Sequence, residues 1–248
     1  MFDKTISLAE AYHSASRNSA DLVAAKEAHF INYQTNIIAL KAADYTHSNT
    51  VDKISLDPPS DLGDVSFGDV LYCRKSSRDF DSKQISFSHL SDLLHYSNGY
   101  KDPAKGTKFA PSTGGFKSVE LFVIAFSVEG LPAGIYHYDA PQHSLVPLHK
   151  GLYQTWVKQH VFYQQEYGQA SLVLVMASNM SKLKKKYGLR SYRLGLLDVG
   201  HVSQNLYLIA TALGLKACAS AGFIDHELDD ALHLDGQNMS SLLTMIIG

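Results

Sequence analysis

Cysteine is scarce in this chain of 248 residues, and its placement excludes two common kinds of site. The two cysteines, Cys73 and Cys218, lie far apart and form no CxxC motif. Their number and spacing argue against a structural zinc site and against a fold held together by disulfides. We therefore expect no metal site and a reducing, cytoplasmic location.

An excess of one charge and a long apolar run are also missing. Lysine and arginine total 22 and aspartate and glutamate 24, a formal net charge of -2, so no general field attracts nucleic acid or an anionic membrane. No stretch approaches 18 uninterrupted apolar residues, and the first residues lack a basic head followed by an apolar segment. We expect neither nucleic-acid binding, nor a membrane span, nor secretion.

What the chain does have is enough apolar material for a large core, since 45% of its residues are hydrophobic. Residues 1–60, with Pro58 and Pro59 near their end, are interpreted as an arm and linker, and residues 61–248 as one domain. In that domain the patterns predict a helix ending at Cys73, a helix capped by Ser86 or Ser88 and ended by Gly99, and a three-stranded meander within 119–148. A long helix over about 190–213, ended by Gly214, and two late strands around a helix capped by Asp225 complete an α+β fold.

The long helix carries unusually small residues. Gly195 and Gly200 lie inside it, although a glycine costs a helix about 1 kcal/mol relative to alanine. Such positions let another backbone or a planar ligand approach closely. Asp198, His201 and Asn205 follow a spacing that indicates one face, and we interpret His201 as a hydrogen-bonded core residue.

The stretch "RKSSRDF" places two guanidinium groups and a hydroxyl close together. Arg74, Ser76 and Arg78 could converge on one anion, for which phosphate is the natural ligand, with Lys75 as a weaker candidate. The alternative is a solvated helix end whose arginines complement the helix dipole.

Two further stretches can each be interpreted either as an ordinary surface segment or as part of a functional site. The loop "PSTGG", which consists of Pro111, Ser112, Thr113, Gly114 and Gly115, exposes backbone N–H groups and leaves room for a flat ring, or it is an ordinary loop entering a strand. It is neither a Walker A loop nor a GxGxxG motif. The run "KLKKKYGLRSYR", residues 182–193, is either a solvated basic loop or part of a site next to the long helix.

Taken together, the motifs resemble the nitroreductase superfamily, and within it the SagB-type dehydrogenases, which include azoline oxidases. The resemblance runs from about Leu71 to Gly248. It rests on five stretches in the family's order: "RxSxRxF" at 74–80, "PSxGG…VELFV" from 111, "GIYHYD" at 134–139, "KYGLRSYR…DVGHVSQNLYLIATALGL" at 186–215, and "AGFID…L" leading to a terminal "IIG".

The resemblance implies a nitroreductase-like α+β fold, with a mostly antiparallel central sheet flanked by helices, and a homodimer that binds FMN at the subunit interface. It assigns the flavin phosphate to Arg74, Ser76 and Arg78, with Lys75 as a weaker candidate. The ring would lie against residues 111–115 and, through backbone groups, against Ala221 and Gly222. The family's late basic residue is missing from the terminal "SSLLTMIIG", which adds Arg193 as a candidate for the phosphate.

The resemblance also implies a catalytic pair, Lys186 and Tyr187, and the dehydrogenation of an azoline in a peptide or related natural product, with oxygen reoxidising the flavin. Like charges on neighbouring Lys184, Lys185 and Arg190 would favour the neutral amine of Lys186, which can then accept a proton. A cyclodehydratase or another biosynthetic enzyme is a possible partner. The alternatives are a reductase that passes electrons from NAD(P)H to a nitro, quinone or enone substrate, a flavin-free scaffold subunit of a peptide-modifying complex, and a nucleic-acid binder using "KLKKK".

Overall fold

The structure is a computed structural model, and it describes residues 8, 11–13, 15–17 and 52–248. Most of the predicted arm, up to residue 51, therefore lies outside the described residues. The helices are α4 (Phe67–Cys73), α5 (Phe87–Asn98), α6 (Gln154–Trp156), α7 (Met180–Tyr187), α8 (Ser191–Ala212) and α9 (Asp225–Ala231), with short η helices at Thr113–Gly115, Val157–Val161, Gln165–Gln169 and Gly188–Arg190.

Seven strands form the central sheet in the order β1-β6-β5-β4-β7-β9-β8, and every neighbouring pair is antiparallel. The strands are β1 (Ile54–Ser55), β4 (Val119–Ala125), β5 (Gly134–Asp139), β6 (Ser144–Lys150), β7 (Leu172–Asn179), β8 (Ala217–Ser220) and β9 (Met239–Ile247). Two short strands, β2 (Tyr100–Asp102) and β3 (Thr107–Lys108), pair separately. The predicted meander is confirmed as β4-β5-β6, and the two late strands join the same sheet.

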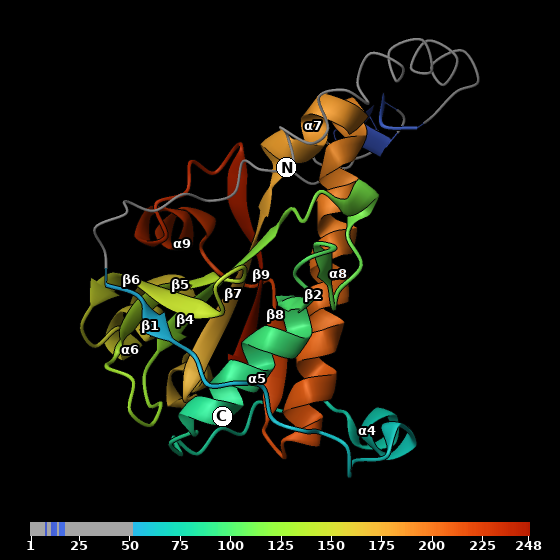
Figure 1. The fold of residues 1–248 in the computed structure, drawn as a ribbon. Coiled ribbons are helices and arrows are strands. Elements are labelled where there is room, and N and C mark those ends of the chain that lie inside the picture. Colours follow the sequence, from blue (N-terminus) through green and yellow to red (C-terminus); the bar gives the residue numbers. More distant parts are fainter. Residues whose placement is uncertain (1–7, 9–10, 14, 18–51) are drawn as a thin grey trace.

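The sheet separates two apolar cores, because side chains alternate between its faces. On β4, Leu121 and Val123 pack with α5 and α8, while Phe122 and Ile124 pack with α9 and the helical segments after β6. In Figure 1, α5 and α8 accordingly cover one side of the sheet and α9 lies on the other. The predicted α+β class, with helices flanking an antiparallel sheet, is confirmed.

The long helix α8 contains 22 residues and is followed by Gly214 with a φ of +71°, a left-handed conformation that glycine adopts without strain. Ser86 caps α5, whose last residue precedes Gly99, as the sequence predicts. One detail differs. Asp225 is the first residue of α9 and Ile224 occupies the cap, so the carboxylate of Asp225 lies in the first turn, where it complements the helix dipole.

The lysine-rich run after β7 is a helix and not a loop. Helix α7 begins after Asn179, whose side chain accepts a hydrogen bond from the backbone N–H of Lys182. Lys182 and Leu183 face the interior, whereas Lys184 and Lys185 are exposed. Figure 1 shows α7 at one end of α8 and α4 at the other.

At the start of the continuous region, residues 52–60 attach to the domain edge. Strand β1 pairs with Ser144 and Leu145 of β6, and both the N–H and the hydroxyl of Ser60 bond the carboxylate of Asp92 on α5. The boundary after residue 60 stays a prediction. Among the described residues, no helix is both long and apolar enough to cross a bilayer.

Candidate functional site

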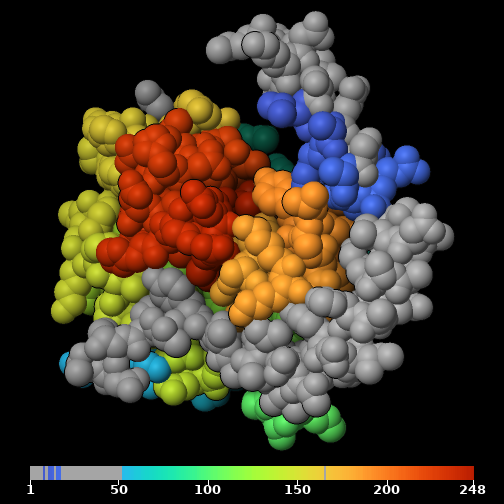
Figure 2. Space-filling view, turned by 90° about the horizontal axis from the view of Figure 1, so that it is seen from above, coloured from blue at the N-terminus to red at the C-terminus, as the bar shows by residue number. Residues whose placement is uncertain are grey.

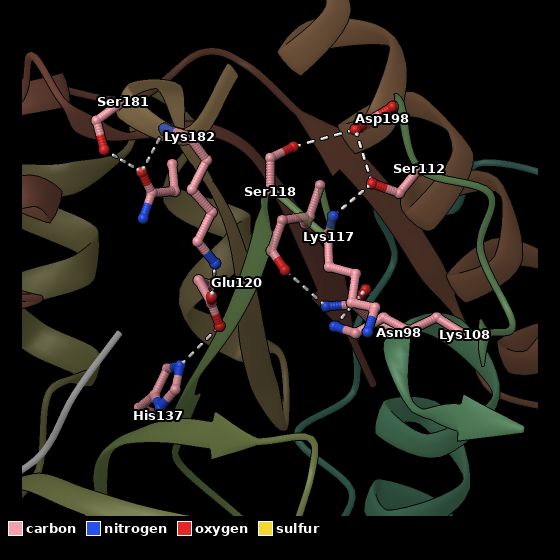
Figure 3. A network of polar contacts seen from close by, with 12 residues as sticks. Asn98, Lys108, Ser112, Lys117, Ser118, Glu120, His137, Ser181, Lys182 and Asp198 are labelled. Carbon is pink, nitrogen blue, oxygen red and sulfur yellow. Dashed lines mark hydrogen bonds and ion pairs between the residues drawn. The ribbon is translucent and has the colours of Figure 1, made fainter. Parts of the chain in front are cut away.

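One buried carboxylate holds the PSTGG loop in shape. Asp198 of α8, which is 2% exposed, accepts hydrogen bonds from the N–H and hydroxyl of Thr113 at 3.0 and 2.8 Å and from the hydroxyls of Ser112 and Ser118 at 3.2 and 3.0 Å. Ser112 in turn accepts the N–H of Lys117 (Figure 3). The sequence singled out Asp198 only through its spacing on the helix, and its role in the loop was missed.

The loop places Gly114 against the predicted catalytic pair. Gly114 and Gly115 have φ values of +58° and +69°, the left-handed region. A Cβ on Gly114 would lie 2.5 Å from the hydroxyl oxygen of Tyr187 and 3.1 Å from the ring of Phe116. Tyr187 therefore occupies the space that the missing side chain leaves, and the structure brings loop and tyrosine together.

The two members of the predicted pair share an aromatic surface. The ring of Tyr187 meets that of Phe116 edge-on, with centroids 6.1 Å apart. Lys186 Nζ lies 5.7 Å from the Phe116 centroid and 5.3 Å from that of Tyr187. Burial, and next the negative charge of Asp198, raise the pKa of Tyr187, so its hydroxyl stays protonated at neutral pH and can donate a hydrogen bond.

The stretch RKSSRDF, residues 74–80, which we call the arginine-rich opener, lies directly after α4, at the end of α8 away from α7. Lys75, Ser76 and Arg78 are exposed and Arg74 is half-buried. Ser76 Oγ lies 2.8 Å from the hydroxyl of Tyr207 on α8, and the Arg74 guanidinium lies 5.2 Å from the centre of the same ring. The hydroxyl of Tyr167, next to Cys218, accepts a hydrogen bond from Arg78, which raises the pKa of that guanidinium. The roles of Tyr207 and Tyr167 were missed, since each depends on a partner far away in the sequence, Ser76 for Tyr207 and Arg78 for Tyr167.

The remaining candidates lie apart from one another. Arg193 donates to the ring nitrogen and carbonyl oxygen of His13, at 2.7 and 3.0 Å, and Figure 2 shows the described N-terminal residues against the surface of α7 and α8. Arg193 and Tyr207 are 14 residues apart on one helix, about 21 Å at 1.5 Å per residue, so this chain does not bring Arg193 to the opener.

Ala221 and Gly222 follow β8, the strand to which the opener is attached. The N–H of Ser77 donates to the carbonyl of Ala217, and the N–H of Gly222 donates to the Ser220 hydroxyl. A Cβ on Gly222 would meet its nearest atom at 3.6 Å, so packing within the chain does not require glycine there.

His201 is exposed and not a core residue. Asn205, which is half-buried, donates to the carbonyl of Ser97, whereas Asp198 is buried. The spacing still places the three residues on one side of α8, within about 60° of one another. His201 lies at the edge of this arc, where it is exposed, so only its interpretation as a core residue is wrong.

A second cluster of polar side chains, which we did not predict from the sequence, connects α7 to the sheet. Glu120 on β4 lies 3.2 Å from His137 Nε2 on β5 and 3.9 Å from Lys182 Nζ on α7, and all three side chains are nearly buried (Figure 3). Lys186 and Tyr187 lie about one turn further along α7. The ionic group thus fixes the helix that carries the predicted catalytic pair.

The donor set of the opener fits the phosphate of a flavin nucleotide. Among the described residues, neither Arg74 nor Arg78 forms an ion pair, although two guanidinium groups and a hydroxyl gather there. At the PSTGG loop, Gly114 and Gly115 are left-handed and exposed, and the Cβ space of Gly114 is taken by Tyr187, so a flat ring would approach the exposed backbone beside this tyrosine.

Most of the described domain also matches a known family. The sequence profile of the Nitroreductase family matches residues 71–248. The chain belongs to the nitroreductase family. The match begins three residues before the arginine opener and includes every predicted site residue, from Arg74 to Gly222.

Two curated proteins are similar in sequence. A protein of Methanocaldococcus jannaschii that is named a nitroreductase is 32% identical over 174 residues, which cover 70% of this chain and 87% of that protein. The microcin B17-processing protein McbC of Escherichia coli is 27% identical over 176 residues, covering 68% of this chain and 64% of McbC. The resemblance to the superfamily and its SagB-type branch is thus confirmed.

Solved structures share the fold. A nitroreductase-like protein of Anabaena variabilis superposes with a TM-score of 0.69 at 23% identity, over 83% of this chain but only 45% of that one. In the E. coli microcin synthetase complex McbBCD, bound to a truncated precursor, the matching chain gives a TM-score of 0.62 at 22% identity, over 86% of this chain and 80% of that one. These likenesses confirm the nitroreductase-like architecture.

Proposed function

We propose that this nitroreductase-family oxidoreductase depends on FMN and dehydrogenates an azoline, a thiazoline or oxazoline in a peptide or related natural product, to the azole. The observation that carries the proposal is the contact between Tyr187 and Gly114. It joins the Lys186–Tyr187 pair to the loop assigned to the flavin ring. The similarity to McbC supports the same chemistry, because McbC is named for microcin B17 processing.

Different groups of site residues would hold different parts of FMN. Arg74, Ser76 and Arg78, with Lys75 beside them, would bind the phosphate through charge-assisted hydrogen bonds. Residues 111–115 would bear on the ring, and Ala221 and Gly222 would offer backbone groups, with Arg193 as a further candidate from the start of α8. Bound FMN supplies the acceptor for a hydride.

The protein's own part is to take up a proton and position the substrate. Converting an azoline to an azole removes two hydrogens, one as a hydride and one as a proton from carbon. Lys186, whose Nζ lies beside the rings of Phe116 and Tyr187, acts as the base that accepts that proton. The protonated hydroxyl of Tyr187, held between Phe116 and Gly114, orients the azoline ring by donating a hydrogen bond to it.

We further propose a homodimer and a biosynthetic partner such as a cyclodehydratase, in the cytoplasm. The solvent-facing side of α8 carries Leu196 and Leu197, 43% and 59% exposed, and α4 carries Phe67 and Tyr72, 67% and 91% exposed. Large exposed apolar side chains of this kind are typical of an interface. The likeness to a chain of the McbBCD complex supports the proposal of a biosynthetic partner.

The experiment compares two half-reactions in single turnovers. Lys186→Ala and Tyr187→Phe are expected to slow bleaching of the flavin by an azoline peptide by 10²- to 10⁴-fold, as for loss of a positioned general base. Reduction of a quinone with NADPH should change much less. Lys150→Ala, at an exposed position at the end of β6, is the control for loss of a lysine and should leave both rates unchanged. Equal rates for all variants with the azoline peptide would refute the assignment.

A second candidate is an NAD(P)H-dependent reductase of nitro, quinone or enone compounds. The M. jannaschii relative named a nitroreductase favours it, at 32% identity. This candidate predicts fast flavin reduction by NAD(P)H, no bleaching by azoline peptides and no dependence on Lys186.

A further inference from the structure

Tyr207 links the arginine opener to strand β8 through its hydroxyl. The phenol oxygen lies 2.7 Å from the backbone nitrogen of Ala219, which donates to it, and 2.8 Å from Ser76 Oγ. Tyr207 is 9% exposed, whereas Ser76 is exposed. One buried side chain therefore spans from the sheet to the surface residue at the predicted phosphate site.

The hydrogen atoms in this chain of contacts have one arrangement that satisfies every buried donor. The Ala219 N–H occupies an acceptor site of the Tyr207 oxygen. If Ser76 also donated to that oxygen, the Tyr207 proton would be buried without an acceptor, which is costly. Tyr207 therefore donates to Ser76 Oγ, and the Ser76 proton is left to point outward, toward an incoming anion.

The same tyrosine also orients a guanidinium. The Arg74 Cζ lies 5.2 Å from the centre of the Tyr207 ring, a cation–π distance. The ring and the hydroxyl thus fix two of the three groups assigned to the phosphate. Arg78 is held separately, by Tyr167.

We propose that Tyr207 is the positioning residue of the phosphate site, and that through Ser76 and Arg74 it sets the preference of this protein for a phosphorylated flavin, FMN, over riboflavin. This inference rests on the proposed FMN site. It makes Tyr207 act through its neighbours, without itself touching the ligand.

The test is a titration of the flavin-free full-length protein with FMN and, separately, with riboflavin, followed by quenching of flavin fluorescence. Tyr207→Phe keeps the ring under Arg74 and removes only the hydroxyl. FMN affinity should fall about tenfold, the scale of one hydrogen bond, while riboflavin affinity stays the same. Tyr136→Phe is the matched control, because it removes another tyrosine hydroxyl, bonded to the carbonyl of Pro132 at 2.6 Å. It should change neither affinity.

A second variant tests the same contact from its exposed end, where folding is not at risk. Ser76→Ala should also weaken FMN selectively, and the double variant Ser76→Ala/Tyr207→Phe should lose no more than Ser76→Ala alone, since both changes break one chain of hydrogen bonds. Additive losses would overturn the proposal, as would equal losses for FMN and riboflavin, or no loss in Ser76→Ala. A wild-type protein that binds neither flavin would instead refute the FMN site itself.

Discussion

The hydroxyl of Tyr187 lies 2.5 Å from the point where Gly114 would carry a Cβ. The glycine is therefore required twice, by its φ of +58° and by the tyrosine beside it. Gly114→Ala should displace Tyr187 and slow azoline oxidation by about 10²-fold, the scale expected when a catalytic group moves by about 1 Å. Single-turnover bleaching of the flavin measures this loss.

Gly130→Ala separates displacement of Tyr187 from backbone strain. Gly130 has a φ of +70°, but nothing lies within 4 Å of its added Cβ. In urea titrations, Gly130→Ala should lose about 1 to 2 kcal/mol of unfolding free energy, the cost of a left-handed alanine, and Gly114→Ala should lose more because its Cβ also meets Tyr187. A Gly130→Ala variant as slow as Gly114→Ala would show that strain alone explains the effect.

Asp198 gives a prediction about loop order. In Asp198→Asn the amide nitrogen cannot accept a hydrogen bond, so one oxygen must replace two as acceptor for Ser112, Thr113 and Ser118. We expect unfolding free energy to fall by about 1.5 to 3 kcal/mol, the worth of hydrogen bonds to a charged group, and oxidation to slow.

Asp229→Asn is the control for that variant. Asp229, on α9 and away from the loop, is also buried. It accepts hydrogen bonds from the N–H of Ser241 and the hydroxyl of Ser240. It should lose comparable stability in urea while keeping the rate of flavin bleaching. If Asp198→Asn bleached the flavin as fast as Asp229→Asn does, Asp198 would be a structural residue only.

Local patterns predicted the elements whose stability comes from their own periodicity. The apolar spacing of α8 and the β-branched run of β4 carry their structure in the sequence. Helix α7 could not be predicted in the same way. One of its inward-facing positions is occupied by Lys182, whose Nζ lies 3.9 Å from Glu120, a contact between residues 62 positions apart that no local pattern encodes.

The residues of the candidate site also fall into two groups, those found from short motifs and those whose roles depend on distant partners. The glycine-rich loop, the opener and the Lys186–Tyr187 pair stand out because each is a short motif. The roles of Asp198, Tyr167 and Tyr207 could not be predicted in this way, because they depend on partners 80 or more positions away, such as Ser118 and Ser76. The sequence shows that Arg193 is charged, but not that its guanidinium forms a hydrogen bond with His13.

The opener makes a prediction about affinity. Arg74→Ala or Arg78→Ala should weaken FMN binding roughly ten- to hundredfold, since each charge-assisted hydrogen bond contributes about 1.5 to 3 kcal/mol. Lys83→Ala, which removes an exposed cation paired with Asp81, should not change it. Flavin retained after dialysis of the double arginine variant would contradict the assignment and make Arg193 the next candidate.

A histidine pair remote from the site should make folding sensitive to mild acid. Burial lowers the pKa of His143 and of His95, whose rings lie 5.1 Å apart, and the nearby His143 lowers that of His95 further. His143 Nδ1 lies 2.9 Å from the hydroxyl of Tyr138, which can donate to it only while that nitrogen is unprotonated.

The sign follows from proton binding. With folded pKa values below the unfolded value of about 6.5, the unfolded chain binds more protons, so stability is complete above pH 6.5 and is lost as the pH falls below it. The urea midpoint should therefore be lower at pH 5.5 than at pH 7.5. Carboxylates with a lowered pKa, such as Asp235, lose their contribution only below about pH 4, outside this window.

His143→Asn should flatten this pH dependence. Asparagine tolerates the φ of +45° at position 143 and does not titrate, although it gives up part of the contact with Tyr138 and lowers stability at every pH. His226→Gln, at a side chain that is 75% exposed, should leave the difference between pH 5.5 and pH 7.5 as in the wild type. If His143→Asn kept the full difference, the sensitivity to acid would have to come from other groups, because this substitution removes the titrating nitrogen and relieves the charge it would place beside His95.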